Sequence, residues 1–204
     1  MKFILGTKDR MTQVFDAQGV VHPATILRVT PLTVTQVKTE ETDGYEAVQV
    51  ATGAQKPERV AKANRTKGSF KHVKEFRPNV HNNETIAGLE KGAIIPASVF
   101  APGDTVAVSA VSKGKGFQGV VKRHGFSGGP RSHGNKDIER APGSIGAGGM
   151  QRVFKGVRMA GRMGSDRITV KNLTILQVNE AENLILISGA IPGRKGTLVE
   201  VRGI

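Results

Sequence analysis

The sequence predicts a mainly β protein, an antiparallel barrel that is closed or nearly closed and carries one long basic loop. Two observations lead to this prediction. Short segments rich in β-branched residues recur at roughly ten-residue spacing, which is typical of an antiparallel barrel. The stretch from Ser112 to Arg167 interrupts them: it holds 14 of the 26 glycines and has little strand or helix periodicity. A hydrophobic content of 38% is low, but it suffices for a modest core.

Short strands are expected in the first quarter of the chain, at residues 3–5, 13–15, 20–29, 33–37 and 45–50. Asp16 to Gly19 reads as a hairpin turn with glycine at its end, and Asp43-Gly44 as a second turn. Pro23 cannot donate a ladder hydrogen bond, so the start of its strand is placed at a sheet edge.

A small basic insertion is expected at residues 56–93. Pro57 to Asn64 has the start signal of a short helix, since proline is favoured in the first turn. Residues 79–83 read as a loop, and His72 and His81 as isolated surface histidines. This segment contains a run of cations: Lys56, Arg59, Lys62, Arg65, Lys67, Lys71 and Lys74. The run favours contact with nucleic acid, although a solvated surface would explain it too.

The remaining strands are expected at residues 94–100, 104–111, 168–170, 173–178, 184–188 and 198–201. The alternation of apolar and polar residues changes phase at Lys171-Asn172, which indicates a β-bulge. Residues 173–178 and 184–188 are expected to form a hairpin. The last strand is expected to close the barrel against the first.

Positive charge is concentrated in the stretch from Ser112 to Arg167. The chain has a net charge of +13 and a pI near 10.3. Twelve Lys and Arg lie in this stretch against Asp137, Glu139 and Asp166, so it carries +9 of the total. Concentrated charge of this kind favours a polyanionic partner, most often nucleic acid.

Disorder in the free protein is an alternative for this stretch. Apolar residues distributed through it argue against a simple linker: Phe117, Phe126, Ile138, Ile145, Met150, Phe154, Met159 and Met163.

Lys and Arg neutralise phosphates, and glycine lets the backbone approach RNA closely. The side chains expected to contact RNA are Lys113, Lys115, Lys122, Arg123, His124, Arg131, His133, Lys136, Arg140, Arg152, Lys155, Arg158, Arg162 and Arg167. The glycines expected to allow close backbone approach are Gly114, Gly116, Gly119, Gly143, Gly146, Gly156, Gly161 and Gly164.

Other chemistries fit the sequence less well. Gly114 to Gly119 matches a dinucleotide-binding G-x-G-x-x-G, with Glu139 twenty residues later, but no helix is expected at the last glycine. His124 and His133 lie near Asp137 and Glu139 without a convincing metal-ligand spacing. No nucleophile elbow surrounds any serine. We therefore expect no catalytic residue, no metal, no cofactor and no small-molecule substrate.

The chain has no cysteine, which excludes disulfides and thiolate sites. Residues 1–6 are too short for a signal peptide, and the longest aliphatic run, 184–187, is far shorter than a membrane span. A soluble cytoplasmic protein with no membrane partner is expected.

Several motifs together resemble one family. They are Ser112 to Phe117, Lys122-Arg123, Arg140 to Gly146, Val153 to Gly156 and Met159 to Gly164. Residues 5–8, 11–15, 43–50 and 189–193 match it as well. On these residues the chain resembles the L-three family of large-subunit ribosomal proteins, bacterial type. The resemblance spans nearly the whole chain and is weakest at 55–95.

The resemblance implies a six-stranded translation-protein-type β-barrel with a small α+β insertion and a long, mostly irregular loop rich in Gly, Arg and Lys. The barrel would comprise residues 1–55 and 94–122 plus 167–204, the insertion 56–93 and the loop 123–166. The implied partners are large-subunit (23S-type) rRNA and neighbouring large-subunit ribosomal proteins, without homo-oligomerisation. The loop would approach the peptidyl-transferase centre, and the protein would support early subunit assembly in the cytoplasmic ribosome without catalysis. The alternative is a free-standing RNA-binding or RNA-chaperone protein.

The chain departs from the family pattern at a few positions. His124 stands where tryptophan is common, so the stacking group is smaller. The run from Ala147 to Arg152 is one residue shorter than usual, and the glutamine methylation known in the family is not transferred to Gln151.

Overall fold

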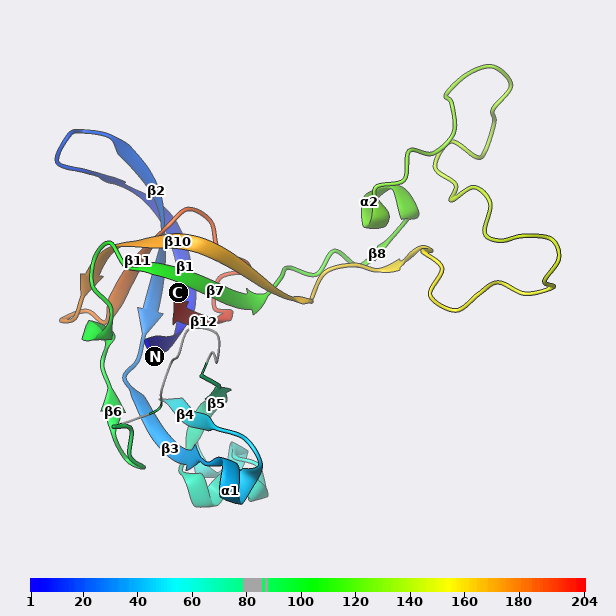
Figure 1. Ribbon diagram of the computed structural model, residues 1–204. Helices are drawn as coiled ribbons and strands as arrows, with labels where there is room; N and C mark the ends of the chain where they lie inside the picture. The colour runs from blue at the N-terminus through cyan, green and yellow to red at the C-terminus, as the bar shows by residue number, and fades with distance from the viewer. Residues whose placement is uncertain (79–85, 87) are drawn as a thin grey trace. The chain divides into compact units, whose positions relative to one another are not determined.

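The computed structural model describes residues 1–78, 86 and 88–204 (Figure 1). Two compact units make up the chain. The barrel unit comprises Met1–Val111 and Arg167–Ile204, and the loop unit comprises Ser112–Asp166. The predicted mainly β class is confirmed. The loop expected at 79–83, with His81, lies outside the described residues, as does part of the expected insertion.

Six antiparallel strands of the barrel unit are hydrogen-bonded in the cyclic order β1-β12-β7-β10-β11-β2, which closes the sheet into a barrel. The last strand pairs with the first, with Val201 opposite Ile4. The strands are β1 (Phe3–Phe15), β2 (Val21–Val29), β7 (Thr105–Val111), β10 (Arg167–Asn179), β11 (Leu184–Ser188) and β12 (Leu198–Gly203).

A second sheet has the strand order β5-β4-β3-β6. Its strands are β3 (Leu32–Lys38), β4 (Ala47–Ala54), β5 (Phe70–Phe76) and β6 (Ile94–Ile95). The family resemblance implied that all of residues 1–55 belong to the barrel, whereas β3 and β4 belong to this separate sheet. Alternation of apolar residues identifies a strand but not its partner, because the partner depends on contacts far along the chain.

Two further expectations need correction. The helix expected at 57–64 is instead two 3₁₀ turns, η1 (Pro57–Arg59) and η2 (Lys62–Lys67). The strand expected at 94–100 ends at Ile95, because Pro96 has no amide hydrogen to continue the ladder, and the 3₁₀ turn η4 (Ala97–Val99) follows. The four-residue helix α1 (Glu40–Asp43) ends at Gly44, whose φ of 75° closes the expected turn.

The first strand is longer than predicted. Residues 3–5 and 13–15 belong to one continuous strand, β1, with a register shift between Lys8 and Met11. Its polar middle lacks alternation because it lies in the exposed hairpin that β1 forms with β2 (Figure 1). The expected turn at 16–19 is confirmed: the Asp16 amide donates to the Val20 carbonyl over 3.0 Å, and Gly19 has a φ of 79°.

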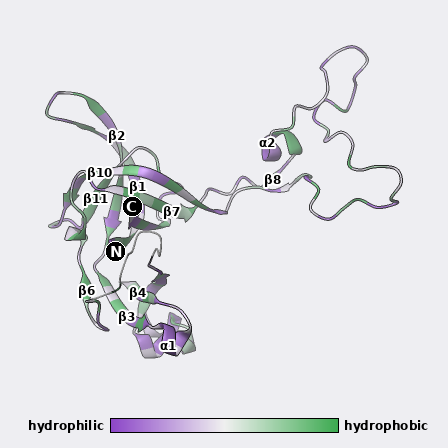
Figure 2. Ribbon diagram, viewed as in Figure 1, coloured by the Kyte–Doolittle hydropathy of each residue, from purple (hydrophilic) through white to green (hydrophobic). Residues whose placement is uncertain are grey.

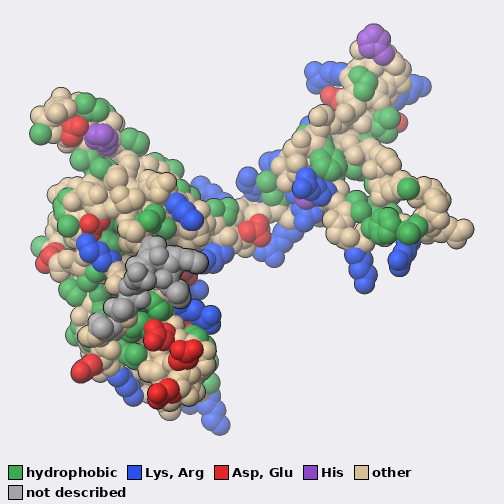
Figure 3. All heavy atoms as spheres, viewed as in Figure 1, with side chains coloured by type: hydrophobic (Ala, Val, Ile, Leu, Met, Phe, Trp, Pro, Cys, Tyr) green, Lys and Arg blue, Asp and Glu red, His purple; other side chains and the backbone are tan. Residues whose placement is uncertain are grey.

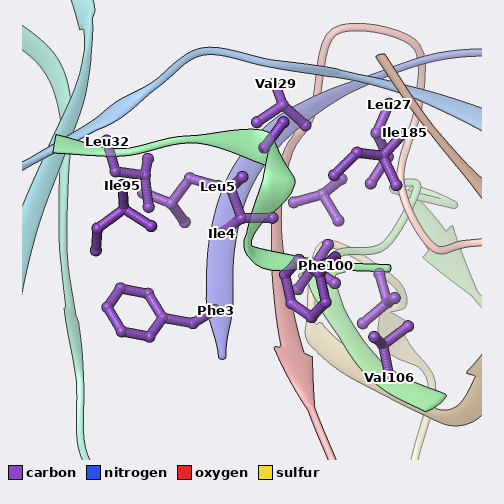
Figure 4. Packing of buried hydrophobic residues seen from close by; sticks show 14 of the residues in the cluster. Phe3, Ile4, Leu5, Leu27, Val29, Leu32, Ile95, Phe100, Val106 and Ile185 are labelled. Atoms are coloured by element: carbon purple, nitrogen blue, oxygen red, sulfur yellow. The ribbon is translucent and has the colours of Figure 1, made fainter. Parts of the chain in front are cut away.

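The hydrophobic core extends through the barrel and the second sheet. Successive residues of a strand point to opposite faces, so the full burial of Phe3, Ile4 and Leu5 means that both faces of β1 are covered. Figure 4 shows Leu5 with Leu32 and Ile95 at one side of the cluster. The ring of Phe3 stacks on that of Phe76 in β5, with centroids 4.4 Å apart, and so joins the two sheets.

Both ends of the loop unit attach to neighbouring barrel strands. Val111 at the end of β7 lies opposite Arg167 at the start of β10. The bulge expected at Lys171-Asn172 is confirmed, since the register shifts between Val170 and Leu173 and Asn172 has a φ of 58°. The barrel therefore fixes where the loop unit begins and ends.

Candidate nucleic-acid interface

The loop unit begins and ends in a paired segment, residues 112–118 and 161–166, called the neck. The Ser112 amide donates to the Asp166 carbonyl over 2.9 Å, and the Lys115 amide to the Met163 carbonyl over 2.9 Å. The Met163 amide returns a 3.0 Å bond to the Gly116 carbonyl. Two short strands, β8 (Phe117–Gln118) and β9 (Gly161–Arg162), complete the pairing. The Gly-rich motif thus forms an irregular two-stranded ribbon.

Glycines are required in the neck for intramolecular reasons. A Cβ at Gly164, whose φ is 76°, would lie 2.2 Å from the Lys113 carbonyl oxygen. A Cβ at Gly114 would lie 3.0 Å from Ser165 Oγ. The close approach of the two backbones therefore depends on Gly164 in particular. Gly116, Gly143 and Gly156 have positive φ angles and open space around them.

A short helix, α2 (Val120–His124), follows β8 directly and corrects the expectation of no helix after Gly119. It is brief because Gly125 ends it in the left-handed region, with φ 75°, and donates to the Val121 carbonyl over 3.0 Å. The dinucleotide fingerprint still fails, because β7 has only antiparallel partners. Val120, in α2, is the buried residue of the loop unit, at 3% exposure.

The end of α2 is bonded to the returning chain. Arg123 Nη1 donates to the Met159 carbonyl over 2.7 Å, and His124 Nε2 lies 3.1 Å from the same oxygen. The Arg123 guanidinium covers Gly161, where a Cβ would lie 2.6 Å from Nη1. Arg123 and His124 therefore hold the loop unit together rather than pointing freely into solvent, which sequence spacing alone did not indicate.

Beyond α2, residues 125–160 contain no helix or strand, and a closed sub-loop forms at 128–139. The Gly129 amide donates to the Glu139 carbonyl over 2.9 Å, and a Cβ at Gly128 would lie 2.1 Å from that oxygen. Asn135 Nδ2 donates to the Pro130 carbonyl, and Arg131 Nε lies 3.4 Å from Glu139 Oε1. Gly128, Gly129 and Asn135 were not among the predicted site residues. The Gly-Gly-Pro run was the available signal, because glycines allow two backbone segments to approach closely.

A cavity of about 770 Å³ lies beside this sub-loop. Its side chains are mostly apolar, with Phe126, Ile138 and Pro142 among glycines and no charged group in the lining. Phe126 also lies next to the His124 ring, with centroids 5.9 Å apart. The loop unit thus combines an apolar cavity with many cationic side chains.

Lys and Arg side chains lie on the surface of the loop unit (Figure 3), along a ribbon that carries hydrophobic as well as hydrophilic residues (Figure 2). Most of these cations have no side-chain partner. The structure describes the whole of residues 112–166, which contain eleven Lys and Arg against three acidic residues. Only Arg123 and Arg131 have a side-chain partner among these eleven, through Met159 and Glu139. The side chains of the nine others are exposed and have no ion pair or hydrogen bond with the described residues: Lys113, Lys115, Lys122, Lys136, Arg140, Arg152, Lys155, Arg158 and Arg162.

The predicted site residues therefore differ in their surroundings and in the unit to which they belong. His133 is exposed in the sub-loop with a φ of 59°. Arg167 belongs to β10 of the barrel unit, where it pairs with Glu200, which also binds Lys74 over 3.1 Å. Gly119 and Gly146 have nothing within 4 Å of a built Cβ.

Large apolar side chains of the loop unit are also exposed. Phe117 is 77% exposed, and Ile138, Met150 and Phe154 are each about half exposed or more. With one buried residue, the loop unit has no apolar core that would offset the entropy of ordering it. Such side chains suit burial against a partner, including stacking on unpaired bases.

Two negative findings apply to the described part of the chain. Residues 1–78, 86 and 88–204 contain no cluster of three His, Asp or Glu side chains that could hold a metal ion. Nor do they include a helix long and apolar enough to span a membrane.

Comparison with known proteins identifies the family. A family model described as ribosomal protein L3 matches residues 47–184, about two thirds of the chain. The chain belongs to the ribosomal protein L3 family. It is 48% identical over 210 residues to the large ribosomal subunit protein uL3 of Bacillus cytotoxicus, an alignment that covers 99% of this chain and 96% of the relative. The resemblance found in the sequence is thereby confirmed.

Proposed function

We propose that the chain is a structural constituent of the large ribosomal subunit that binds large-subunit rRNA through its loop unit. The observation that carries this proposal is the set of nine exposed, unpaired Lys and Arg side chains in an L3-family loop. Cations without protein partners are free to neutralise phosphates, which releases counterions from the RNA. Membership of the L3 family supports a structural rather than an enzymatic role.

The finer parts of the proposal follow from the family. The barrel is of the translation-protein type, the basic segment 56–93 is a small insertion, and the loop extends towards the peptidyl-transferase centre. The protein enters the subunit early in assembly, in the cytoplasm, beside other large-subunit proteins. It acts as a single copy without a small-molecule substrate.

RNA recognition is proposed to combine charge with stacking. Lys155 and Arg158 bind phosphates, since both are exposed and unpaired. Phe126 and Pro142, in the cavity beside the sub-loop, are proposed to stack on an unpaired base of structured RNA. The neck and the Arg123 contact order residues 112–124 and 159–166, so this part of the loop unit adds little ordering cost on binding.

Sedimentation tests the first part. The tagged chain should move with large subunits in a gradient at moderate salt. A chain that stays at the top of the gradient would contradict the proposal and favour a free-standing RNA-binding protein.

Salt dependence tests the second part. The double variant Lys155→Gln, Arg158→Gln should lower the slope of log K against log salt by about 1.5, because two phosphate contacts are lost. The matched control is Lys2→Gln, Lys195→Gln, which removes two lysines that pair with Asp104 and Asp9 in the barrel unit. Equal slopes in the two variants would show that these loop cations do not contact phosphate.

A further inference from the structure

The hairpin of β1 and β2 extends beyond the strands that flank it (Figure 1). Pairing of β1 with β12 ends at Thr7, and pairing of β2 with β11 ends at Ala24. Residues 11–23 therefore form a two-stranded ribbon, and no third strand among the described residues flanks it on either side. A two-stranded ribbon is marginally stable by itself in water, so a partner that covers it would stabilise it.

One face of this ribbon is apolar. Met11 and Phe15 lie on the same face of β1, because they are four residues apart. The register places Val21 opposite Phe15, on the same face. These three side chains are 50%, 60% and 48% exposed. A shallow cavity of about 400 Å³ is lined by Met11, Thr12, Gln13, Val21 and Pro23. The face therefore has a hollow for a side chain of a partner, with the amide of Gln13 as the polar group between Met11 and Phe15.

The charge of the ribbon disfavours RNA as the occupant of this face, and the nearest cations in the sequence are Arg10 and Arg28, on either side of residues 11–27. Residues 11–27 contain no Lys or Arg, in a chain with 30 of them, and their only acidic residue is Asp16. Figure 3 shows the hairpin with hydrophobic side chains, an acidic group and a histidine. A phosphate backbone would meet a carboxylate here and no cation. The apolar face instead has the chemistry of a protein interface core, from which charged residues are depleted.

The turn of the ribbon is held by Asp16. Its Oδ1 accepts hydrogen bonds from the amides of Gln18 and Val20, over 2.8 and 2.9 Å, and its Oδ2 lies 3.1 Å from His22 Nε2. The bond from Val20, and then that from His22, holds the pKa of Asp16 below its ordinary value, so the carboxylate stays charged at neutral pH. A turn fixed in this way presents the apolar face with little ordering cost on binding.

We propose that the face formed by Met11, Phe15 and Val21 binds an apolar, uncharged patch on a neighbouring protein of the large subunit. The inference rests on the proposed function, because it requires the chain to be in that subunit. The proposal assigns RNA contact to the cationic loop unit and protein contact to the ribbon at residues 11–23, which contains no Lys or Arg.

Site-specific cross-linking in assembled subunits tests this inference. Benzoylphenylalanine replaces Phe15 in the full-length chain, large subunits that contain the variant are purified by sedimentation, and the irradiated products are identified by mass spectrometry. We expect cross-links to an apolar segment of one neighbouring ribosomal protein. Val14, which points to the opposite face of β1, is the control position, and its yield of the same cross-link should fall to background.

The outcomes are distinguishable. The inference is overturned, with the proposed function intact, if position 15 cross-links to rRNA or to a second copy of this chain. The same holds if purified subunits give no cross-link, or if positions 14 and 15 give equal yields. Absence of the unmodified chain from large subunits would overturn the proposed function, and the inference with it. If the change at Phe15 alone prevents incorporation, the probe is placed at Met11, on the same face.

Discussion

Replacing Gly164 by alanine should open the neck of the loop unit without unfolding the barrel. A left-handed conformation costs a non-glycine residue roughly 1–2 kcal/mol, and the φ of Gly164 is 76°. The new Cβ would also lie 2.2 Å from the Lys113 carbonyl oxygen, a backbone atom. Relief of that overlap would separate the two chains and weaken the Lys115–Met163 and Met163–Gly116 hydrogen bonds, each contributing about 0.5–1.5 kcal/mol.

The free energy needed to open the neck should therefore fall by roughly 2–5 kcal/mol in this variant. Because about 1.4 kcal/mol is a factor of ten, amide hydrogen exchange at Lys115 and Met163 should accelerate by roughly thirtyfold to several thousandfold. The control is Gly148→Ala, since a Cβ there meets nothing within 4 Å. Unchanged exchange at Met163 in the Gly164 variant would refute the argument that backbone approach holds the neck.

Three further predictions concern the contacts described above. Arg123→Lys should lose the guanidinium group that covers Gly161 and weaken the 2.7 Å hydrogen bond to the Met159 carbonyl. The expected cost of about 0.5–1.5 kcal/mol should be measured as faster amide hydrogen exchange at residues 159–161. Hydrogen bonds from Lys195 and then Arg28 hold the pKa of Asp9 below its ordinary 3.8. The free energy of unfolding that Asp9 contributes is thus present above pH 3.8 and is lost as the pH falls through its lowered pKa in the folded protein. The melting temperature of Asp9→Asn should therefore depend less on pH in that acidic range than the melting temperature of the unchanged protein. Parallel curves for the two proteins would contradict this. Phe3→Ala should cost about 3–5 kcal/mol in urea unfolding, through loss of the Phe76 contact and a cavity between the sheets, while exchange in the neck stays unchanged.

Local features of the fold were predictable where a residue type or a pattern corresponds to one backbone conformation. Gly19 supplied the positive φ of the hairpin turn, and the change of phase at Lys171-Asn172 marked the bulge. Strands such as β11 alternate between more and less buried residues, so the two-residue repeat of apolar side chains is visible in their sequence. The family followed from long motifs rather than from single residues.

Features that depend on distant contacts were not predictable. The assignment of β3 and β4 to a second sheet depends on which strands find each other, not on their composition. The composition of the loop unit predicted its positive charge, but not that Arg123 contacts Met159 or that Gly164 faces Lys113 across the neck. Each of these pairs is separated by more than thirty residues, and nothing local in the sequence distinguishes a paired arginine from a free one.

The attachment of the loop unit to two adjacent barrel strands has a consequence for folding and for variation in loop length. Pairing of Val111 with Arg167 closes a chain segment of 55 residues before β7 and β10 can form their ladder. The entropy of such a closure depends only logarithmically on length, so doubling the segment would cost about 0.6 kcal/mol. The barrel can therefore accept insertions and deletions between these strands at almost constant stability. Length in this part of the chain is then free to follow the shape of the surface that the loop has to fit.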